Sequence, residues 1–513
     1  MFREKQSPSA NSVLEQTNGL RGPRWLEPAS LARLLLCLVA CQAVLQLNSG
    51  FWLDETLSYW ATNAGLSQIV RRCTMWPSSI LYGALFFALR PLGSVGPWIY
   101  RLPSFLAIAL SVLVLFRMAK RLFGSETAWV AVAAFVSLHP VQFAACDARP
   151  YGLGLLAVLF STDLLLQYLD RPSFGRAGRY AVVTALVPYF HLLFGVGLLF
   201  QLLYFVYCRI NGLRVRLGHA AFALATIAVL ALPLANQVLV SSKSAQIHSF
   251  AERPHANNFV EIYFTVDLAL ASLLAFGVAA FAAPKLEWSW ASKGIPRFKV
   301  LAVLWALTGP LLLYLMSSFS QAQVFIPRYY LPYAAGLAIC LAIAVGSFDR
   351  NIVATAFICG LVAMAALPLR HAASLRHTAN LGNWGAAAAF VNEQAILNNT
   401  PILLRSQFAE SNFLPVTPVE DNPSFSQLSY YPLKARVITL PATFSAPARQ
   451  VIDAAVRTPL ASSGRFLFVS YSGPPGSPQP FLFYIQGKLG SWQVRELGNF
   501  DGVIVTEFAV GGK

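Results

Sequence analysis

The sequence predicts a polytopic α-helical membrane protein that ends in a small α/β domain. Of its 513 residues, 56% are hydrophobic and only 12% are charged, and the mean hydropathy is +0.56. Apolar runs of about 20 residues, the length that crosses a bilayer as a helix, recur until about residue 370 and then stop. A soluble protein of this length could not carry so few charges, so the soluble globular class is excluded.

The N-terminal segment 1–30 is polar and basic, which predicts a disordered cytoplasmic tail. The apolar segment after it is too long, and the tail before it too extended, for a standard cleaved signal peptide. We therefore interpret that segment as the first span of a transmembrane domain over residues 31–369, with about 11 helices. The expected spans are 31–49, 101–118, 127–145, 151–169, 179–191, 192–208, 219–239, 259–282, 300–318, 329–347 and 352–368.

Basic residues cluster after alternate spans. The clusters are Lys120 and Arg121, then Arg171, Arg176 and Arg179, then Arg209, Arg214 and Arg216, then Lys285, Lys293, Arg297 and Lys299, and finally Arg350. Because cytoplasmic loops carry the excess of Lys and Arg, we assign these loops and the N-terminus to the cytoplasmic side of a cell inner membrane. The C-terminal region then lies outside. The same rule explains most of the net charge of +16, so no nucleic-acid partner is indicated.

One apolar segment, residues 78–92, is only about 15 residues long and therefore short for a span. If it crossed the membrane, Lys120 and Arg121 would lie outside, against the charge rule. We interpret it instead as a helix in the membrane interface. The first external loop is then long, about residues 50–100, and the acids at positions 54 and 147 share the extracytoplasmic face.

Three carboxylates follow the ends of apolar segments in the external loops. Asp54 and Glu55 stand in Phe-Trp-Leu-Asp-Glu-Thr, and Asp147 opens Asp-Ala-Arg-Pro-Tyr. Carboxylates at the mouth of an apolar helix bundle are costly, so they indicate a functional site. Asp54 could otherwise be a helix N-cap or an ion-pair partner. Asp147 could orient a substrate, hold a divalent cation, or pair with Arg149 or Arg101.

Several short motifs share their order and spacing with one family. They are the Asp54-Glu55 pair after the first span, Arg101-Leu102-Pro103-Ser104, Lys120-Arg121-Leu122-Phe123-Gly124, Asp147 to Tyr151, Tyr189-Phe190-His191, and Arg328-Tyr329-Tyr330-Leu331-Pro332. Over roughly residues 30–370 the chain thus resembles the C-type, lipid-phosphosugar-dependent glycosyltransferases. It is most similar to bacterial relatives of protein O-mannosyltransferases and of the aminoarabinose transferase of lipid A.

Two departures from the family pattern stand out. Many relatives carry His-Pro-Pro-Leu-Tyr at the end of the first-loop helix, where this chain has Trp76-Pro77-Ser78-Ser79-Ile80-Leu81-Tyr82. A metal or phosphate contact by that histidine is therefore absent. The second acid is Asp147 in place of the commoner Glu, which shortens its reach by one methylene.

The resemblance implies a transfer of a sugar from a polyprenyl-phosphate donor to an acceptor hydroxyl or amine, with inversion. Asp54 is the expected base, Glu55 shares this role or faces water, and Asp147 is expected at the acceptor. Arg328 is expected to hold the leaving phosphate, since a guanidinium binds phosphate oxygens at two points, although it could instead reach lipid headgroups. The remaining substrate-binding candidates are Arg149, His191, Tyr151 and Tyr329.

The expected partners are the lipid-linked donor, a lipid, glycan or protein acceptor, and membrane lipids. No cofactor is required, and a divalent cation is compatible with the acids. Two other functions remain open, a polymerase or ligase of preassembled glycans and a transporter of lipid-linked sugars. A transporter would need intramembrane charges along a path and usually internal symmetry, and the chain shows no repeated halves.

The C-terminal segment 370–513 is more polar and has short β-like runs, which predicts an extracytoplasmic α/β domain. The runs are 401–405, 436–440, 465–470 and 502–506, and a helix is expected at 386–397. Cys73 and Cys146 fall in the loops that carry the acids, but no spacing rule supports a disulfide between them.

Overall fold

The computed structural model describes residues 27–75, 79–213, 215–243, 253–281, 296–348, 351–367, 382–396, 400–412, 422–460, 463–473 and 476–510. Most of the expected cytoplasmic tail, the expected domain boundary at residues 369 and 370, and the Trp76-Pro77-Ser78 part of the motif departure lie outside these residues.

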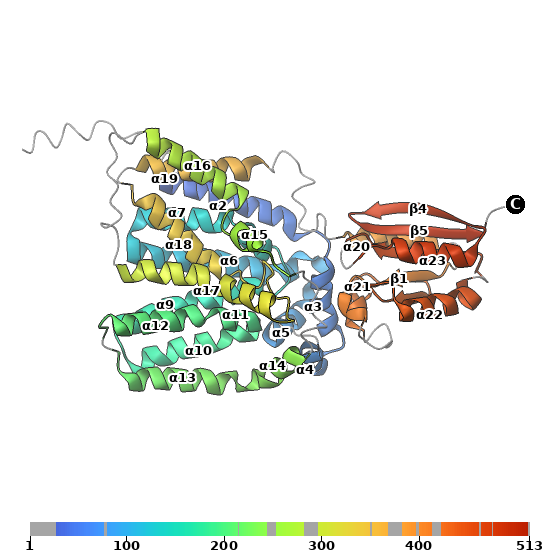
Figure 1. Ribbon diagram of the computed structural model, residues 1–513, viewed down its shortest axis with the longest axis horizontal. Helices are drawn as coiled ribbons and strands as arrows, with labels where there is room; N and C mark the ends of the chain where they lie inside the picture. The colour runs from blue at the N-terminus through green and yellow to red at the C-terminus, as the bar shows by residue number, and fades with distance from the viewer. Residues whose placement is uncertain are drawn as a thin grey trace, which may run out of the picture.

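The larger part of the molecule is a bundle of long helices that run alongside one another (Figure 1). Its helices are α2 (Pro28–Leu47), α6 (Trp98–Phe123), α7 (Ser125–Ser137), α8 (His139–Ala145), α9 (Tyr151–Asp170), α10 (Phe174–Phe190), α11 (Leu192–Gly197), α12 (Leu199–Ile210), α13 (Leu217–Ala231), α14 (Ala235–Lys243), α15 (Ala256–Glu261), α16 (Val266–Phe281), α17 (Pro296–Phe319), α18 (Tyr333–Gly346) and α19 (Asn351–Ala366). Many of their large apolar side chains face outward, among them Leu113, Leu203, Leu273 and Phe276. An apolar outer surface on a helix bundle is what a lipid environment requires.

The predicted spans correspond to these helices. Within the described residues, six helices are long and apolar enough to cross a membrane by themselves, and the pair α7 and α8 forms a seventh if counted as one bent span. The mostly helical, polytopic architecture is therefore confirmed, while the number of eleven spans stays a prediction.

The expected span at 127–145 is not one straight helix, because α7 and α8 meet at an angle of 72°. Pro140 lies at the start of α8 and has no N–H to continue the helix from α7. The carbonyl of Val136, which Pro140 leaves without its helical donor, accepts from the side-chain amide of Gln142 at 2.9 Å. The sharp turn brings the end of α8, and Asp147 after it, to the mouth of the bundle.

The segment expected to form the first external loop folds into short helices at one end of the bundle. They are α3 (Leu53–Asn63), α4 (Leu66–Met75), α5 (Ile80–Leu89) and the 3-10 helix η3 (Arg90–Val95). The Ser79 side chain caps α5 by accepting from the backbone N–H of Tyr82 at 3.0 Å. With 10 residues, α5 is about 15 Å long, which is too short to cross a bilayer.

The C-terminal part is a five-stranded sheet with the order β2-β1-β3-β5-β4. The strands are β1 (Ile402–Arg405), β2 (Val437–Leu440), β3 (Arg465–Tyr471), β4 (Trp492–Phe500) and β5 (Val503–Val510). The first three pair in parallel, and β5 and β4 are antiparallel to their neighbours. Four of these strands match the predicted runs. The fifth, β4, was missed because it is an edge strand with mostly exposed residues and no buried apolar run.

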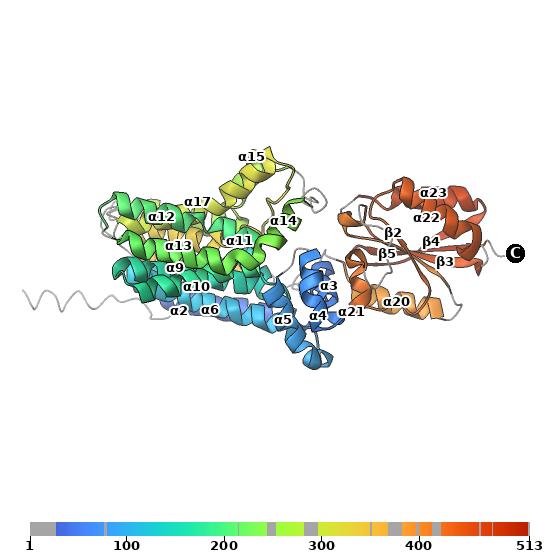
Figure 2. The same ribbon diagram turned by 90° about the horizontal axis from the view of Figure 1, so that it is seen from below.

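Helices cover both faces of the sheet, α20 (Trp384–Ile396) on one and α22 (Ala446–Ala455) with α23 (Gln479–Leu489) on the other (Figure 2). The side chains of β1 alternate between the two faces, as a strand requires. Leu404 packs with Trp384 and Val391 of α20, and Leu403 packs with Ile452 and Phe481 on the opposite side. The α/β class predicted for this part is confirmed.

Candidate active site

The eight predicted site residues come from four separate segments that meet at one end of the bundle. Asp54 and Glu55 lie in the first turn of α3, where the helix dipole favours negative charge. Residues 147–150 form the connection from α8 to α9. The remaining segments are the junction of α10 and α11 at His191 and the approach to α18 at Arg328 and Tyr329.

Glu55 points into the protein. Its side chain is fully buried and forms a two-point pair with Arg101 of α6, at 2.7 Å from Nε to Oε1 and 2.5 Å from Nη2 to Oε2. The Oε1 atom also accepts from the backbone N–H of Ala148 at 2.7 Å, and Oε2 accepts from that of Trp52 at 3.2 Å. Each oxygen therefore accepts two hydrogen bonds, which accounts for the four sites a carboxylate offers.

Arg101 uses its remaining donors on the chain between α2 and α3. It donates to the carbonyl oxygens of Leu47 at 2.8 Å, Ser49 at 2.6 Å and Gly50 at 2.9 Å. The pair Glu55–Arg101 thus joins the end of α2, the start of α3, the start of α6 and the connection that carries Asp147. A fully buried pair of this kind holds segments in place, because losing either partner leaves a buried charge uncompensated.

Asp54 is not part of this buried pair and keeps partial contact with solvent. Its Oδ2 lies 2.9 Å from Nη1 of Arg328, and the two side chains are 14% and 20% exposed. Arg149 holds the same turn by donating to the backbone carbonyl of Asp54 at 3.1 Å and to the hydroxyl of Ser58 at 3.3 Å. Of the two neighbouring acids, Asp54 is the one a substrate could reach.

Asp147 is almost completely buried and accepts from the indole N–H of Trp52 at 3.0 Å. Burial raises the pKa of Asp147 well above its usual range, and the nearby charge of Glu55 adds to the effect. Burial therefore favours the protonated form of the Asp147 carboxyl. Because Trp52 comes two residues before Asp54, this bond also places both aspartates at the same end of the bundle.

Arginine and aromatic side chains complete the site beside Asp54. The Arg328 guanidinium lies 5.7 Å from the ring centre of Trp52 and 5.5 Å from that of Tyr329. The Arg149 guanidinium lies 5.9 Å from the ring of Tyr151. Arg101 neutralises Glu55, and burial favours the protonated form of Asp147, so two guanidinium groups lie beside the one partly exposed carboxylate of Asp54. The site therefore has an excess of positive charge suited to an anion.

His191 lies between the two tyrosines, with its ring centre 5.4 Å from that of Tyr151 and 4.8 Å from that of Tyr329. Its Nδ1 atom is buried and has no hydrogen-bond partner among the described residues. An imidazole here can form a hydrogen bond with a substrate group.

The structure adds one site residue that the sequence reasoning did not include, Trp52. It donates to Asp147 and lies under Arg328, so it connects an acid with a cation. Its position next to the Asp-Glu pair was the available signal in the sequence.

No group of three or more His, Cys, Asp or Glu side chains arranged to hold a metal occurs in the described part of the chain. Cys73 and Cys146 are both free thiols.

The fold is similar to that of solved membrane enzymes. ArnT from Cupriavidus metallidurans in the apo state aligns with a TM-score of 0.51 at 13% identity, over 94% of this chain and 98% of that one. ArnT of the same organism bound to undecaprenyl phosphate gives the same values. Since ArnT is the lipid A aminoarabinose transferase, the resemblance inferred from the motifs is confirmed at the level of the fold.

The arabinosyltransferase EmbB from Mycobacterium smegmatis also aligns, at 14% identity over 65% of this chain and 33% of that one. Its TM-score of 0.40 is too low to support an argument. No protein-family model matches the chain, and no curated protein does.

Proposed function

We propose that the protein is an integral-membrane glycosyltransferase that moves a sugar from a polyprenyl-phosphate donor to an acceptor. The observation that carries this proposal is the contact of Asp54 with Arg328, next to Arg149, at the mouth of an apolar bundle. A carboxylate that can act as a base then stands beside two cations that can hold a phosphate. The shared fold with ArnT, which was crystallised with undecaprenyl phosphate, supports the same donor class.

The reaction is a single displacement. Asp54 takes the proton of an acceptor hydroxyl or amine, whose oxygen or nitrogen forms the new bond to the anomeric carbon as the bond from that carbon to the phosphate oxygen breaks. The phosphate leaves with the electron pair, and Arg328 and Arg149 stabilise its charge. Because attack and departure occur on opposite faces of the sugar, the configuration inverts.

Other residues have supporting roles in this proposal. Asp147 acts on the acceptor side of the site through Trp52, from whose indole N–H it accepts, and His191 with Tyr151 and Tyr329 lines the space beside the phosphate. Glu55 is a positioning residue, because its oxygens are already engaged by Arg101, Ala148 and Trp52. A phosphate bound to Arg328 competes with Asp54 for the guanidinium, so donor binding would release the base when it is needed.

The orientation is part of the proposal. The site and the C-terminal sheet lie on the extracytoplasmic side of a cell inner membrane, and the N-terminus is cytoplasmic. Single cysteines at exposed positions test this in a variant without native cysteines. A membrane-impermeant thiol reagent should label Ser94→Cys and Ser477→Cys in intact cells but not Ser173→Cys, which needs permeabilised cells. Labelling of positions 94 and 173 from the same side would refute the arrangement.

A direct assay tests the activity. Purified protein in detergent is mixed with a radiolabelled polyprenyl-phosphate sugar and an extract of cell-envelope acceptors, and transfer is followed by chromatography. Transfer without vesicles excludes a transporter. Asp54→Asn should abolish transfer while the protein stays folded and still binds polyprenyl phosphate. An active Asp54→Asn variant would refute the mechanism.

A second experiment identifies the donor sugar. The lipid-linked sugar that accumulates in a deletion strain is identified by mass spectrometry.

A further inference from the structure

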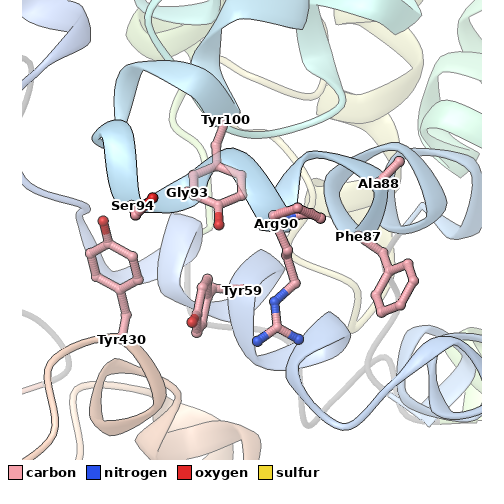
Figure 3. A pocket seen from close by; sticks show the side chains of 9 residues that line it. Tyr59, Phe87, Ala88, Arg90, Gly93, Ser94, Tyr100 and Tyr430 are labelled. Atoms are coloured by element: carbon pink, nitrogen blue, oxygen red, sulfur yellow. The ribbon is translucent and has the colours of Figure 1, made fainter.

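A cavity lies apart from the site around Asp54. It has a volume of about 630 Å³ and opens where the short helices of the first loop meet the C-terminal part. Its wall contains Tyr59 of α3, Arg90 of η3, Tyr100 of α6 and Tyr430 of α21 (Gln427–Tyr430), as Figure 3 shows. Residues from both parts of the molecule therefore form one pocket.

The pocket lies on the side of α3 opposite to the reactive carboxylate. Tyr59 follows Glu55 by one helical turn, and Tyr100 directly precedes Arg101. Residues four positions apart share a helix face, so Tyr59 stands on the Glu55 face of α3 and away from Asp54, and the Tyr100 ring packs against Tyr59. A ligand in this pocket would contact the protein separately from the group that reacts.

The tyrosines give the pocket an aromatic wall with available hydroxyls. The ring of Tyr59 lies 5.0 Å from that of Tyr430 and 6.3 Å from that of Tyr100, both nearly perpendicular to it. No hydrogen-bond partner for these three hydroxyls occurs in the described part of the chain, and Figure 3 shows the Tyr100 hydroxyl pointing into the space between the rings. Aromatic faces with nearby hydroxyls match the apolar C–H faces and hydroxyl groups of a saccharide.

Arg90 adds a positive charge. It donates to the carbonyl of Thr62 at 2.8 Å, and its guanidinium lies 5.1 Å from the ring centre of Tyr59. Among the described residues no carboxylate forms an ion pair with Arg90, so its other N–H groups can bind an anion from the ligand. A saccharide that carries a phosphate or carboxylate fits this combination best.

The edge of the pocket is apolar. Leu92 and Val95 of η3, on either side of the pocket residues Gly93 and Ser94, are 52% and 59% exposed. Such side chains on a short helix at the end of an apolar bundle suit the membrane interface. A ligand whose lipid chains remain in the bilayer can therefore reach the pocket with its headgroup.

We infer that this pocket binds the anionic saccharide headgroup of a membrane-anchored glycolipid, which is the acceptor or a portion of it. The identification of this glycolipid as the acceptor rests on the proposed function. Its binding to the pocket can be tested without any sugar transfer. Burial raises the pKa of Tyr430 to about 12, so its hydroxyl remains a donor under ordinary conditions.

The experiment measures equilibrium binding to the full chain in phosphatidylcholine nanodiscs, with empty nanodiscs as the blank. The main probe is dodecyl glucoside 6-phosphate. Three related probes remove one feature each: dodecyl glucoside lacks the anion, dodecyl phosphate lacks the sugar, and glucose 6-phosphate lacks the lipid chain. The complete probe should bind at least tenfold more tightly than each of the three.

Variants assign the binding to the pocket. Arg90→Gln should abolish the preference for dodecyl glucoside 6-phosphate over dodecyl glucoside, whereas Arg71→Gln on the exposed face of α4 should keep it. Tyr430→Ala should weaken both glucosides at least fivefold. Since this substitution touches the contact with α3, Tyr430→Phe provides a gentler second variant, with thermal unfolding as the check on its fold.

Several outcomes would overturn the inference. One is that Arg90→Gln and Tyr430→Ala bind dodecyl glucoside 6-phosphate within twofold of the parent affinity. The others are that dodecyl phosphate, or free glucose 6-phosphate, binds the parent as tightly as dodecyl glucoside 6-phosphate does. None of them depends on transfer. If transfer fails but binding behaves as expected, the proposed function is wrong and the pocket stands. If transfer occurs and these variants leave probe binding and the acceptor KM unchanged, only the pocket assignment fails.

Discussion

Glu55 and Arg101 form a two-point ion pair in which both side chains are completely excluded from solvent. Glu55 belongs to α3 and Arg101 to α6, and the pair also binds backbone groups of the segment before α3 and of Ala148. The adjacent Asp54 instead keeps partial contact with solvent beside Arg328. Two neighbouring acids therefore have different tasks, one holding the site together and the other available for chemistry.

This division predicts different responses to substitution. Glu55→Gln leaves the buried guanidinium of Arg101 without its counterion, so we expect a loss of about 3–5 kcal/mol in stability. Asp54→Asn removes a pair whose partner Arg328 keeps some contact with solvent, so it should cost less than Glu55→Gln. Thermal unfolding in detergent measures both, with Glu261→Gln at an exposed position as the control. A Glu55→Gln protein as stable as the parent but inactive would instead make Glu55 a catalytic group.

Arg328 is expected to act on the donor. Arg328→Gln removes charge-assisted hydrogen bonds that are each about 1.5–3 kcal/mol, which corresponds to a rise of roughly 10- to 100-fold in the donor KM or Kd. Arg328→Lys should recover part of this loss, because the charge remains but the two-point geometry does not. Binding of polyprenyl phosphate gives the measurement, and Arg297→Gln, which changes an arginine paired with Asp170, is the control. An unchanged donor affinity would count against the role.

The sequence revealed much of the fold because its patterns are local. Apolar runs of span length and alternating strand runs need no knowledge of distant contacts, and the four strands they predicted are present. The break between α7 and α8 was missed, although the Pro140 that causes it is visible in the sequence. The edge strand β4 was missed because the side chains of an edge strand need not be buried.

The candidate site was predictable as a set of residues but not as a geometry. The motifs identified Asp54, Glu55 and Asp147, yet nothing in the sequence indicates which carboxylate meets Arg101. That assignment depends on where α6 enters the bundle relative to α3. The pocket around Tyr59 and Arg90 was equally hidden, because Tyr430 comes from a helix more than 300 residues later in the chain.

The burial of Asp147 predicts an unusual pH dependence. Its pKa is raised in the folded state relative to about 3.9 in the unfolded chain, so the folded protein holds this proton to higher pH. The stability that Asp147 contributes is therefore complete below the unfolded pKa and is lost as the pH rises through the folded pKa. Asp147→Asn keeps an acceptor for Trp52 and carries no charge, so this variant should be more stable than the parent at neutral pH.

Thermal unfolding between pH 4.5 and 8 checks this expectation. The unfolding temperature of Asp147→Asn should exceed that of the parent by a margin that grows as the pH rises. Asp453→Asn is the control, because Lys488 lowers the pKa of that surface carboxyl and the sign of its contribution is opposite. Parallel curves for Asp147→Asn and the parent would show that burial does not shift the titration of Asp147.

The last prediction concerns the contact between the C-terminal part and the segment that precedes Asp54, the proposed base. The hydroxyl of Tyr431 accepts from the backbone N–H of Phe51 at 2.5 Å, and the ring of the adjacent Tyr430 stacks on that of Phe51 at 4.3 Å. Phe51 is buried, and Trp52 and Asp54 follow it directly. The C-terminal part therefore holds the segment before α3 in position.

Tyr431→Phe should cost about 1–3 kcal/mol, because it leaves a buried backbone N–H without an acceptor. We expect a lower kcat with an almost unchanged donor Kd, since the phosphate is held by Arg328 and not by this contact. Tyr189→Phe, which removes the bond from an exposed hydroxyl to Leu230, is the matched control. Equal losses in kcat and donor affinity would instead indicate that Tyr431 supports the whole fold, because a contact that only positions the base cannot weaken phosphate binding to the same extent.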